Sequence, residues 1–254
     1  MSHVQVNRDF WNAMADDWVE GGERLWACDP PRWGIWAASE TEAPILPNDM
    51  TGLDAIELGC GTGYVSGWMA RRGARVTGID MSENQLTTAR RLAQHHAAEI
   101  TFLHGNAEAT GLPSESFDFA VSEYGAAIWC DPDIWLREAY RLLRPGGHLT
   151  FLGTHPLMLA ATPLNGDVAD HMLHRPYRTL GRLDWTEVEI EPGGIEFSLP
   201  IAGWFKLFQE IGFHVLDFRE LYAGKNNDGT SFSKIVDWAR DFPSEQVWWL
   251  QKPD

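Results

Sequence analysis

The feature that most constrains this chain is a glycine-rich loop that directly follows a short apolar segment. Residues 55–58 read Ala-Ile-Glu-Leu, which is typical of a buried strand, and glycine then occupies positions 59, 61 and 63. Glycine lets the backbone turn sharply and approach a ligand without a Cβ clash. The dinucleotide-binding fingerprint requires a further glycine at the position of Tyr64, so an NAD or flavin site is disfavoured. We expect the loop to bind another kind of cofactor, and a purely structural turn is the alternative.

Segments of strand and helix character alternate on either side of this loop. Apolar and β-branched runs predict five strands, at residues 55–58, 75–79, 100–103, 117–121 and 148–152. Helices are predicted at 64–72, after a capping box at 82–85, and at 132–143. This alternation indicates an α/β fold with a doubly wound, Rossmann-like, mostly parallel sheet.

The two ends of the chain are expected to complete the fold. Apolar side chains at three- and four-residue spacing predict a helix over 6–18, and a second short helix is expected to carry Trp33 and Trp36. These two helices would form an N-terminal helical cap. A helix over 201–211 and two last strands, at 214–218 and 246–250, would bring the sheet to seven strands.

The alternation fails between Pro156 and Pro200, where histidine, proline, glycine and aromatic residues are frequent. We expect an inserted flap with antiparallel strands at 185–190 and 195–199, joined around Pro192-Gly193-Gly194. The whole chain, 1–254, is then one domain. Its expected parts are the cap (1–48), a cofactor-binding core (52–155), the flap (156–200) and a C-terminal helix with the last two strands (201–254).

Composition narrows the possible partners. The 20 Lys and Arg residues against 36 Asp and Glu residues give a net charge of −16, which repels nucleic acid and anionic lipid. The three cysteines, Cys28, Cys60 and Cys130, form no Cys-x-x-Cys pair, so neither a disulfide framework nor a zinc site is expected. Neither a signal segment nor a spanning segment is recognisable. We therefore expect a cytoplasmic monomer or homodimer that binds neither nucleic acid nor membranes.

Asp80 ends the second predicted strand about twenty residues after the glycine loop, where a carboxylate can accept hydrogen bonds from both ribose hydroxyls of an adenosine ligand. A charge at a helix start is the alternative. Together with this acid, four stretches, 56–63, 78–82, 105–109 and 143–149, resemble the class I S-adenosylmethionine (SAM)-dependent methyltransferases. The chain is most similar to the small-molecule branch of menaquinone and ubiquinone methyltransferases (type 11), closely over residues 55–152.

The resemblance implies SAM as the cofactor and a role for particular residues. The glycine loop would face the methionine part and ribose, Asp80 would hold the ribose, and Met81 would cover the adenine. Asn106, where such enzymes usually have Asp, and the backbone N–H of Ala107 would bind the adenine. An N-terminal helix would cover the cofactor, and residues after the fourth strand would reach its methionine end. The cofactor-binding residues expected in this way are Trp11, Trp18, Gly59, Cys60, Gly61, Gly63, Asp80, Met81, Asn106, Ala107, Glu108, Glu123 and Tyr124.

The methyl acceptor is expected to be an apolar or aromatic small molecule held between the tryptophan-rich cap, the end of the fifth strand and the flap. A sulfonium already makes its methyl group electrophilic, so transfer requires mainly alignment and desolvation. A hydroxyl, thiol or enolisable carbon acceptor would gain from a base, and His155, just after the fifth strand, is the candidate. A turn histidine without a chemical role is the alternative.

Other functions remain open at this point. An NAD-linked or other adenosyl-cofactor enzyme on the same fold is one alternative, and a SAM-binding protein without catalysis is another. A flap that does not close over the cofactor would favour the latter. No metal is expected, because the reaction needs none and no acidic cluster accompanies His171 and His174.

Overall fold

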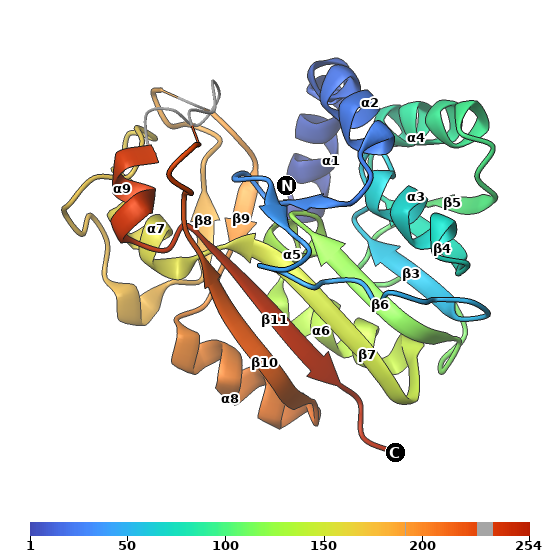
Figure 1. Ribbon diagram of the computed structural model, residues 1–254. Coiled ribbons are helices and arrows are strands. Elements are labelled where there is room, and N and C mark those ends of the chain that lie inside the picture. The colour runs from blue at the N-terminus through green and yellow to red at the C-terminus, as the bar shows by residue number, and fades with distance from the viewer. Residues whose placement is uncertain (191, 228–235) are drawn as a thin grey trace.

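A seven-stranded sheet forms the centre of the computed structural model, which describes residues 1–190, 192–227 and 236–254 (Figure 1). The strand order is β10-β11-β7-β6-β3-β4-β5, and β11 runs antiparallel to both of its neighbours. The strands are β3 (Asp54–Leu58), β4 (Arg75–Asp80), β5 (Ile100–His104), β6 (Phe117–Glu123), β7 (Leu143–Thr154), β10 (His214–Leu221) and β11 (Glu245–Gln251). All seven predicted strands are therefore present, and the doubly wound α/β prediction is confirmed.

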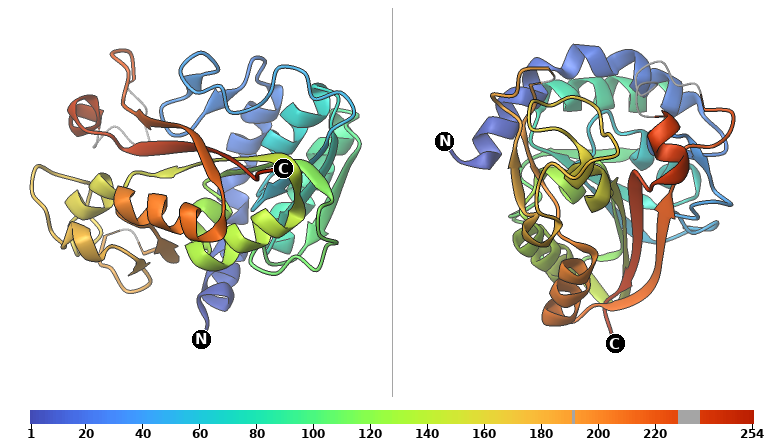
Figure 2. Two further views of the ribbon diagram at one scale, coloured as in Figure 1. Left: turned by 90° about the horizontal axis from the view of Figure 1, so that it is seen from below. Right: turned by 90° about the vertical axis from the view of Figure 1, so that its left-hand side faces the viewer.

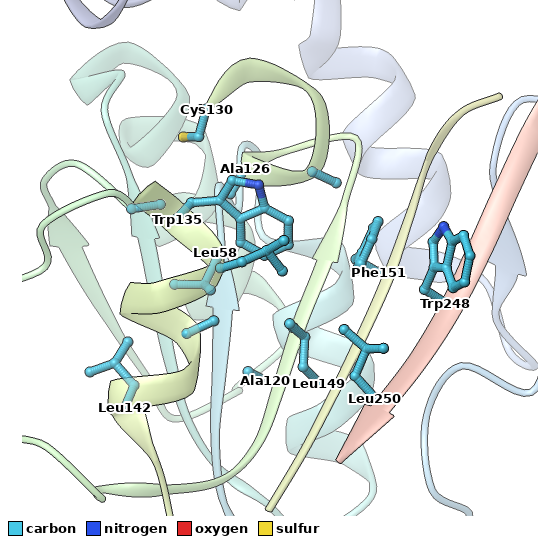
Figure 3. Packing of buried hydrophobic residues seen from close by; sticks show 14 of the residues in the cluster. Leu58, Ala120, Ala126, Cys130, Trp135, Leu142, Leu149, Phe151, Trp248 and Leu250 are labelled. Atoms are coloured by element: carbon cyan, nitrogen blue, oxygen red, sulfur yellow. The ribbon is translucent and has the colours of Figure 1, made fainter. Parts of the chain in front are cut away.

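Helices cover both faces of the sheet. One face packs against α6 (Pro132–Leu142) and α8 (Ile201–Ile211), and the other packs against α3 (Tyr64–Arg71). Figure 3 shows the first of these layers, where the Trp135 ring meets Phe151 at 5.4 Å between centroids. Because side chains alternate along a strand, a buried sheet needs apolar residues at nearly every position. This requirement explains why the strands were recognisable as apolar runs.

The N-terminal segment differs from the prediction at two places. The first helix, α1, covers His3–Ala13 and is followed by a 3₁₀ turn at Ala15–Trp18 and by α2 (Val19–Ala27). The predicted helix through Trp33 and Trp36 is wrong. The chain there forms a small hairpin of β1 (Arg32–Trp33) and β2 (Ala38–Ser39), which turns through Gly34 at φ +64°. Both indole rings are buried, so their spacing of three residues reflected burial and not helical structure.

The flap contains α7 (Pro156–Ala161), a 3₁₀ turn at Tyr177–Thr179, and a hairpin of β8 (Arg182–Asp184) and β9 (Ile195–Phe197). The predicted second strand overlaps β9, but the predicted first strand at 185–190 is wrong, because the strand lies just before it. Asp184 accepts hydrogen bonds from the backbone and the hydroxyl of Thr186, and these bonds turn the chain away from the strand.

Further helices complete the described structure: α4 (Glu83–His95), α5 (Ala126–Trp129) and α9 (Val236–Asp241). Figure 1 shows α1 and the flap hairpin along the edge where the parallel strands end, and the views of Figure 2 show α6 and α8 together on one side of the sheet. Within residues 1–190, 192–227 and 236–254, none of the helices has both the length and the apolar character that crossing a membrane requires.

Candidate cofactor and acceptor site

The glycine loop between β3 and α3 has the backbone conformation that its sequence predicts. Gly59, Gly61 and Gly63 all have positive φ, at +77°, +50° and +78°. A Cβ on Gly59 would lie 2.6 Å from the backbone nitrogen of Ala126, whereas a Cβ on Gly61 would meet no atom within 4 Å. The loop is therefore packed against the protein at one glycine and open at the next, as a ligand-binding turn requires.

A neighbouring helix and a buried side chain of its own hold this loop in place. The indole Nε1 of Trp26 donates to the Thr62 carbonyl at 2.8 Å, so α2 holds the loop in place. The Cys60 side chain is buried within the protein, and burial raises the pKa of its thiol well above the ordinary value. Cys60 was predicted to contact the cofactor. With its side chain buried, it can do so only through its backbone.

Asp80, at the end of β4, connects the loop to the next helix. Its Oδ2 accepts from the Gly61 backbone N–H at 2.8 Å, and its Oδ1 accepts from the Ser82 N–H at 2.8 Å. Each carboxylate oxygen can accept a further hydrogen bond. Burial raises the pKa of the Asp80 carboxyl, an effect that these two N–H donors partly offset. The carboxylate is thus fixed at the carboxyl edge of the sheet with capacity for two hydroxyl donors.

Helix α1 crosses this edge. The Ser82 hydroxyl donates to Asn12 Oδ1 at 2.8 Å, and Asn84 donates to the Asn12 carbonyl at 2.9 Å. Near the other end of the helix, His3 Nε2 lies 2.7 Å from Glu108 Oε1. These contacts place α1 over the segment between the ends of β4 and β5, where the predicted adenosine contacts lie.

The adenine-binding residues predicted after β5 form a tight turn. Asn106 Oδ1 accepts from the Glu108 backbone N–H at 3.0 Å, and Ala107 is buried in the core layer with Met81 packed against it. Glu108 also accepts from the Asp131 N–H at 2.7 Å. The Glu108 carboxylate therefore already has two protein partners, and its clearest role is to join α1 to the start of α6.

Aromatic rings gather under α1. The Trp11 ring lies 5.2 Å from that of Trp129 in α5 and 5.7 Å from that of Trp18. The Trp11 Nε1 is buried without a hydrogen-bond partner, while Trp18 is 48% exposed. A buried indole N–H without an acceptor is unusual, so the Trp11 position is the better suited of the two to meet a ligand.

Asn7 connects α1 to the flap. Its amide donates to the carbonyls of Trp129 and Ile195, both at 2.9 Å, and its Oδ1 accepts from the Ile195 N–H at 2.6 Å. Asn7 is completely buried. A Cβ on Gly194 would approach Asn7 Oδ1 to 2.5 Å, so the flap can come this close only at a glycine. The cap and the flap meet above α5.

Two buried carboxyls at the ends of β6 and β11 hold the turn of the N-terminal hairpin. Glu123 accepts from the Gly34 N–H at 2.7 Å and from the Tyr64 hydroxyl, and Glu245 Oε1 accepts from the Ile35 N–H at 2.9 Å. The Tyr124 hydroxyl donates to Glu245 Oε1 at 2.7 Å. Burial, with the nearby charge of Glu123, raises the pKa of Glu245 to about 8.

His155 lies at the end of β7, as predicted, but both ring nitrogens face protein groups. Nδ1 accepts from the Leu157 N–H at 3.0 Å and caps α7, and Nε2 lies 3.1 Å from Glu220 Oε1. Only 4% of the residue is exposed, and burial lowers the pKa of the ring to about 4, against the opposing effect of Glu220. A nitrogen that already accepts a hydrogen bond is poorly suited to take a proton from a substrate.

The lowered pKa of His155 gives a testable pH dependence. Because the unfolded ring takes up a proton near its ordinary pKa of 6.5 and the folded ring only near 4, we expect the free energy of unfolding to decrease as the pH falls through this window. In His155→Asn, which keeps a capping side chain, the decrease should be shallower. Urea unfolding at pH 7 and pH 4.5 measures it, and parallel pH dependences in the two proteins would contradict the assignment.

The structure thus brings the predicted glycines, Asp80, Met81 and the 106–108 turn to one edge, with Trp11 above them. Sequence reasoning missed several polar and aromatic residues of the same region, because nothing in their local sequence distinguishes them from surface or packing positions. They are Asn7, Asn12, Trp129, Trp185, Glu196 and Glu245. Tyr64 was noticed only as a missing glycine.

Comparisons with known proteins agree with this arrangement. Residues 56–151 match a family described as a methyltransferase domain. The chain is 34% identical over 138 residues to a ubiquinone biosynthesis O-methyltransferase of Ruegeria pomeroyi, a match that covers 54% of each chain. It is 30% identical over 168 residues to an arsenite methyltransferase of Mus musculus, which covers 61% of this chain and 44% of the relative. The chain thus spans about half the length of the curated relatives it matches.

A structural relative extends the similarity of the fold. The crystal structure of a SAM-dependent methyltransferase from Mesorhizobium loti has a TM-score of 0.67 at 24% sequence identity, and the match covers 86% of this chain and 100% of that chain. At this identity the likeness concerns the fold alone. The structural match also includes elements outside residues 56–151.

Proposed function

Because this chain belongs to the class I SAM-dependent methyltransferases, we propose that it transfers a methyl group from SAM to a neutral, hydroxyl-bearing aromatic or apolar small molecule. The observation that most supports the proposal is the edge formed by the open Gly61 turn and the half-buried Asp80 carboxylate near α1. The Asp80 carboxylate suits a ribose, and the Gly61 turn suits the methionine part of the cofactor, which must approach the backbone closely.

The described residues fit the cofactor. Asp80 retains acceptor capacity for the ribose hydroxyls, the glycine loop is open in front of Gly61, and Trp11 has a buried indole N–H without a partner. When bound, SAM supplies an electrophilic methyl group. The task of the protein is then to align the acceptor and to exclude water, which suits an edge that α1 and the flap cover together.

The charges at the acceptor end favour a neutral acceptor. Glu123, Glu245 and Glu196 are all buried there with pKa values raised by burial, so a further anion beside them would be desolvated and would be repelled by whichever of the three is ionised. Half-buried rings of Trp129, Tyr124 and Trp185 lie in the same region and suit an aromatic surface.

The reactions for which the two relatives are named can be compared with the chemistry of this site. Arsenic(III) prefers soft thiolate ligands, but Cys60 and Cys130 are buried with pKa values well above the ordinary one. In the described part of the chain, no group of three or more His, Cys, Asp or Glu side chains is arranged to hold a metal ion. An oxygen acceptor, as the name of the ubiquinone biosynthesis O-methyltransferase indicates for that relative, therefore fits better than arsenite.

Binding experiments test the cofactor assignment. We expect SAM and its demethylated product to bind at least tenfold more tightly than NAD, because Tyr64 occupies the position of the third dinucleotide glycine. Isothermal titration calorimetry with the three ligands measures this difference. Tighter binding of NAD would refute the proposal. With binding established, labelled SAM and a panel of phenols, alcohols, amines and carboxylic acids identifies the acceptor class by mass analysis, and transfer to carboxylic acids alone would contradict the proposed hydroxyl acceptor.

A further inference from the structure

We propose that Glu196, on the flap strand β9, is the general base that accepts the proton of the methyl acceptor. This inference rests on the proposed methyl transfer to a hydroxyl group. It assigns to the flap a chemical role in addition to covering the site.

The pleat of β9 directs Glu196 away from the cap. Its two neighbours belong to the side that meets α1: the Phe197 ring lies 5.0 Å from that of His3, and the backbone of Ile195 is bonded to Asn7. Successive side chains on a strand point to opposite faces. Glu196 therefore lies on the other face, where its carboxyl meets Trp185 and the Thr154 side chain at the end of β7.

One oxygen of this carboxyl is unused. Oε2 accepts from the Trp185 indole at 3.0 Å, but Oε1 is buried and has no hydrogen-bond partner, and only 8% of the residue is exposed. A buried carboxylate oxygen without a donor is costly, and native proteins rarely leave one unless a ligand supplies the donor. An acceptor hydroxyl placed at the end of β7 would supply it.

The surroundings of Glu196 suit proton transfer near neutral pH. Burial raises the pKa of the carboxyl to about 7, and Thr154, Trp185 and the positive charge of Arg175 hold it from rising further. The negative charge of Glu196 in turn contributes to raising the pKa of Tyr124, after β6. From the cap, His3 approaches the ring of Phe197, on the opposite face of β9. A base is most effective when its pKa is near the working pH.

The other side chains in this region that could act as a base already contact protein groups. His155 Nδ1 already accepts from the Leu157 N–H and its Nε2 lies 3.1 Å from Glu220 Oε1, while Glu123 holds the hairpin turn through the Gly34 N–H and the Tyr64 hydroxyl. Glu245 holds the same turn through Oε1, which accepts from the Ile35 N–H and the Tyr124 hydroxyl; its Oε2 is also buried without a hydrogen-bond partner, but it lies beside this turn and not on the flap. Glu196 is the carboxyl here that combines a free oxygen with contacts to both the flap and the end of β7.

The proposed step is balanced in atoms and charge. As the acceptor oxygen forms its bond to the methyl carbon, the carbon–sulfur bond breaks and its electron pair remains on sulfur, which becomes a neutral thioether. The hydroxyl proton passes to Glu196 Oε1, and the resulting carboxylic acid later releases it to water. No oxidant, metal or further reactant is required.

The decisive experiment compares Glu196→Gln with Glu187→Gln, an exposed glutamate of the same flap. We expect Glu196→Gln to lower kcat for a hydroxyl acceptor roughly a hundredfold. SAM affinity by calorimetry should change less than twofold, and Glu187→Gln should behave as the wild type in both assays. In the wild type, kcat should rise with pH through about 7, and this acidic limb should be absent in Glu196→Gln.

A second variant separates proton transfer from a structural role. Trp185→Phe removes the N–H that donates to Oε2 and so should move the acidic limb to higher pH, because the carboxylate loses a stabilising donor. Infrared titration should show a carboxyl that protonates near pH 7 in the wild type and is missing in Glu196→Gln, independently of turnover.

The outcomes distinguish the two proposals. Equal kcat and superimposable pH profiles in the wild type and Glu196→Gln would overturn the role of Glu196 while leaving methyl transfer intact. An unmoved limb in Trp185→Phe, or an infrared titration unchanged by Glu196→Gln, would likewise overturn it. A wild-type protein that binds no SAM would instead refute the proposed function.

Discussion

Replacement of Asp80 by alanine is expected to weaken SAM binding about thirtyfold, or on the order of 2 kcal/mol. The physical reason is that a half-buried carboxylate accepting from two ribose hydroxyls forms charge-assisted hydrogen bonds, and the substitution removes both at once. The same change frees the backbone N–H groups of Gly61 and Ser82, which Asp80 holds at 2.8 Å. Calorimetry gives the affinity, and thermal unfolding shows whether the fold survives.

A matched variant makes this result specific. Asp80→Asn retains the volume and one acceptor oxygen, so its loss of affinity should be smaller than that of Asp80→Ala. Asp217→Ala, at an exposed position of β10, should bind SAM as the wild type does. Unchanged affinity in Asp80→Ala, with an intact thermal transition, would mean that the acid only organises the start of α4.

The parts of the fold that were predictable are those in which local sequence and tertiary packing make the same demand. Helix α8 was predicted over residues 201–211 and is found there, because its apolar face packs on the sheet and Gly212, at φ +107°, ends it. Likewise, the glycine loop and Asp80 are separated in sequence, yet they meet because parallel strands end at one edge. Their roles toward SAM remain predictions.

The N-terminal hairpin shows where sequence reasoning reaches its limit. Trp33 and Trp36 have a spacing that a helix or a turn can satisfy. The turn is stabilised by carboxyls that are distant in sequence. The Gly34 N–H donates to Glu123, 89 residues later, and the Ile35 N–H donates to Glu245, 210 residues later. Such contacts leave no local pattern. The first flap strand was misplaced for a different, local reason: the side chain of Asp184 accepts from Thr186, two residues later, and this bond ends the strand.

Glu196 was missed because its local pattern indicates the opposite environment. An acid between Ile195 and Phe197 is typical of a half-exposed strand with its polar side in water. In the folded chain all three residues of β9 are buried, because the cap covers one face and the end of β7 lies against the other. Only the tertiary structure shows that this acid is enclosed.

Replacement of Asn7 by alanine is expected to lower the free energy of unfolding by about 3 kcal/mol. The substitution leaves the carbonyls of Trp129 and Ile195 and the N–H of Ile195 without their buried partner. Each unsatisfied buried group costs about 1–3 kcal/mol, reduced where water enters. Urea unfolding followed by tryptophan fluorescence measures the change.

The Asn7 variant also tests whether the cap and the flap act as one cover. Gln5→Ala is the control on the same helix, because Gln5 donates to Asp9 at the exposed surface and should change stability by less than about 0.5 kcal/mol. If closure of the cap over the cofactor depends on its bonds to the flap, Asn7→Ala should also weaken SAM binding, even though Asn7 lies beside Trp129 and Ile195 and not beside Asp80. A destabilised variant that binds SAM with wild-type affinity would show that α1 covers the cofactor without help from the flap, and that the flap serves the acceptor alone.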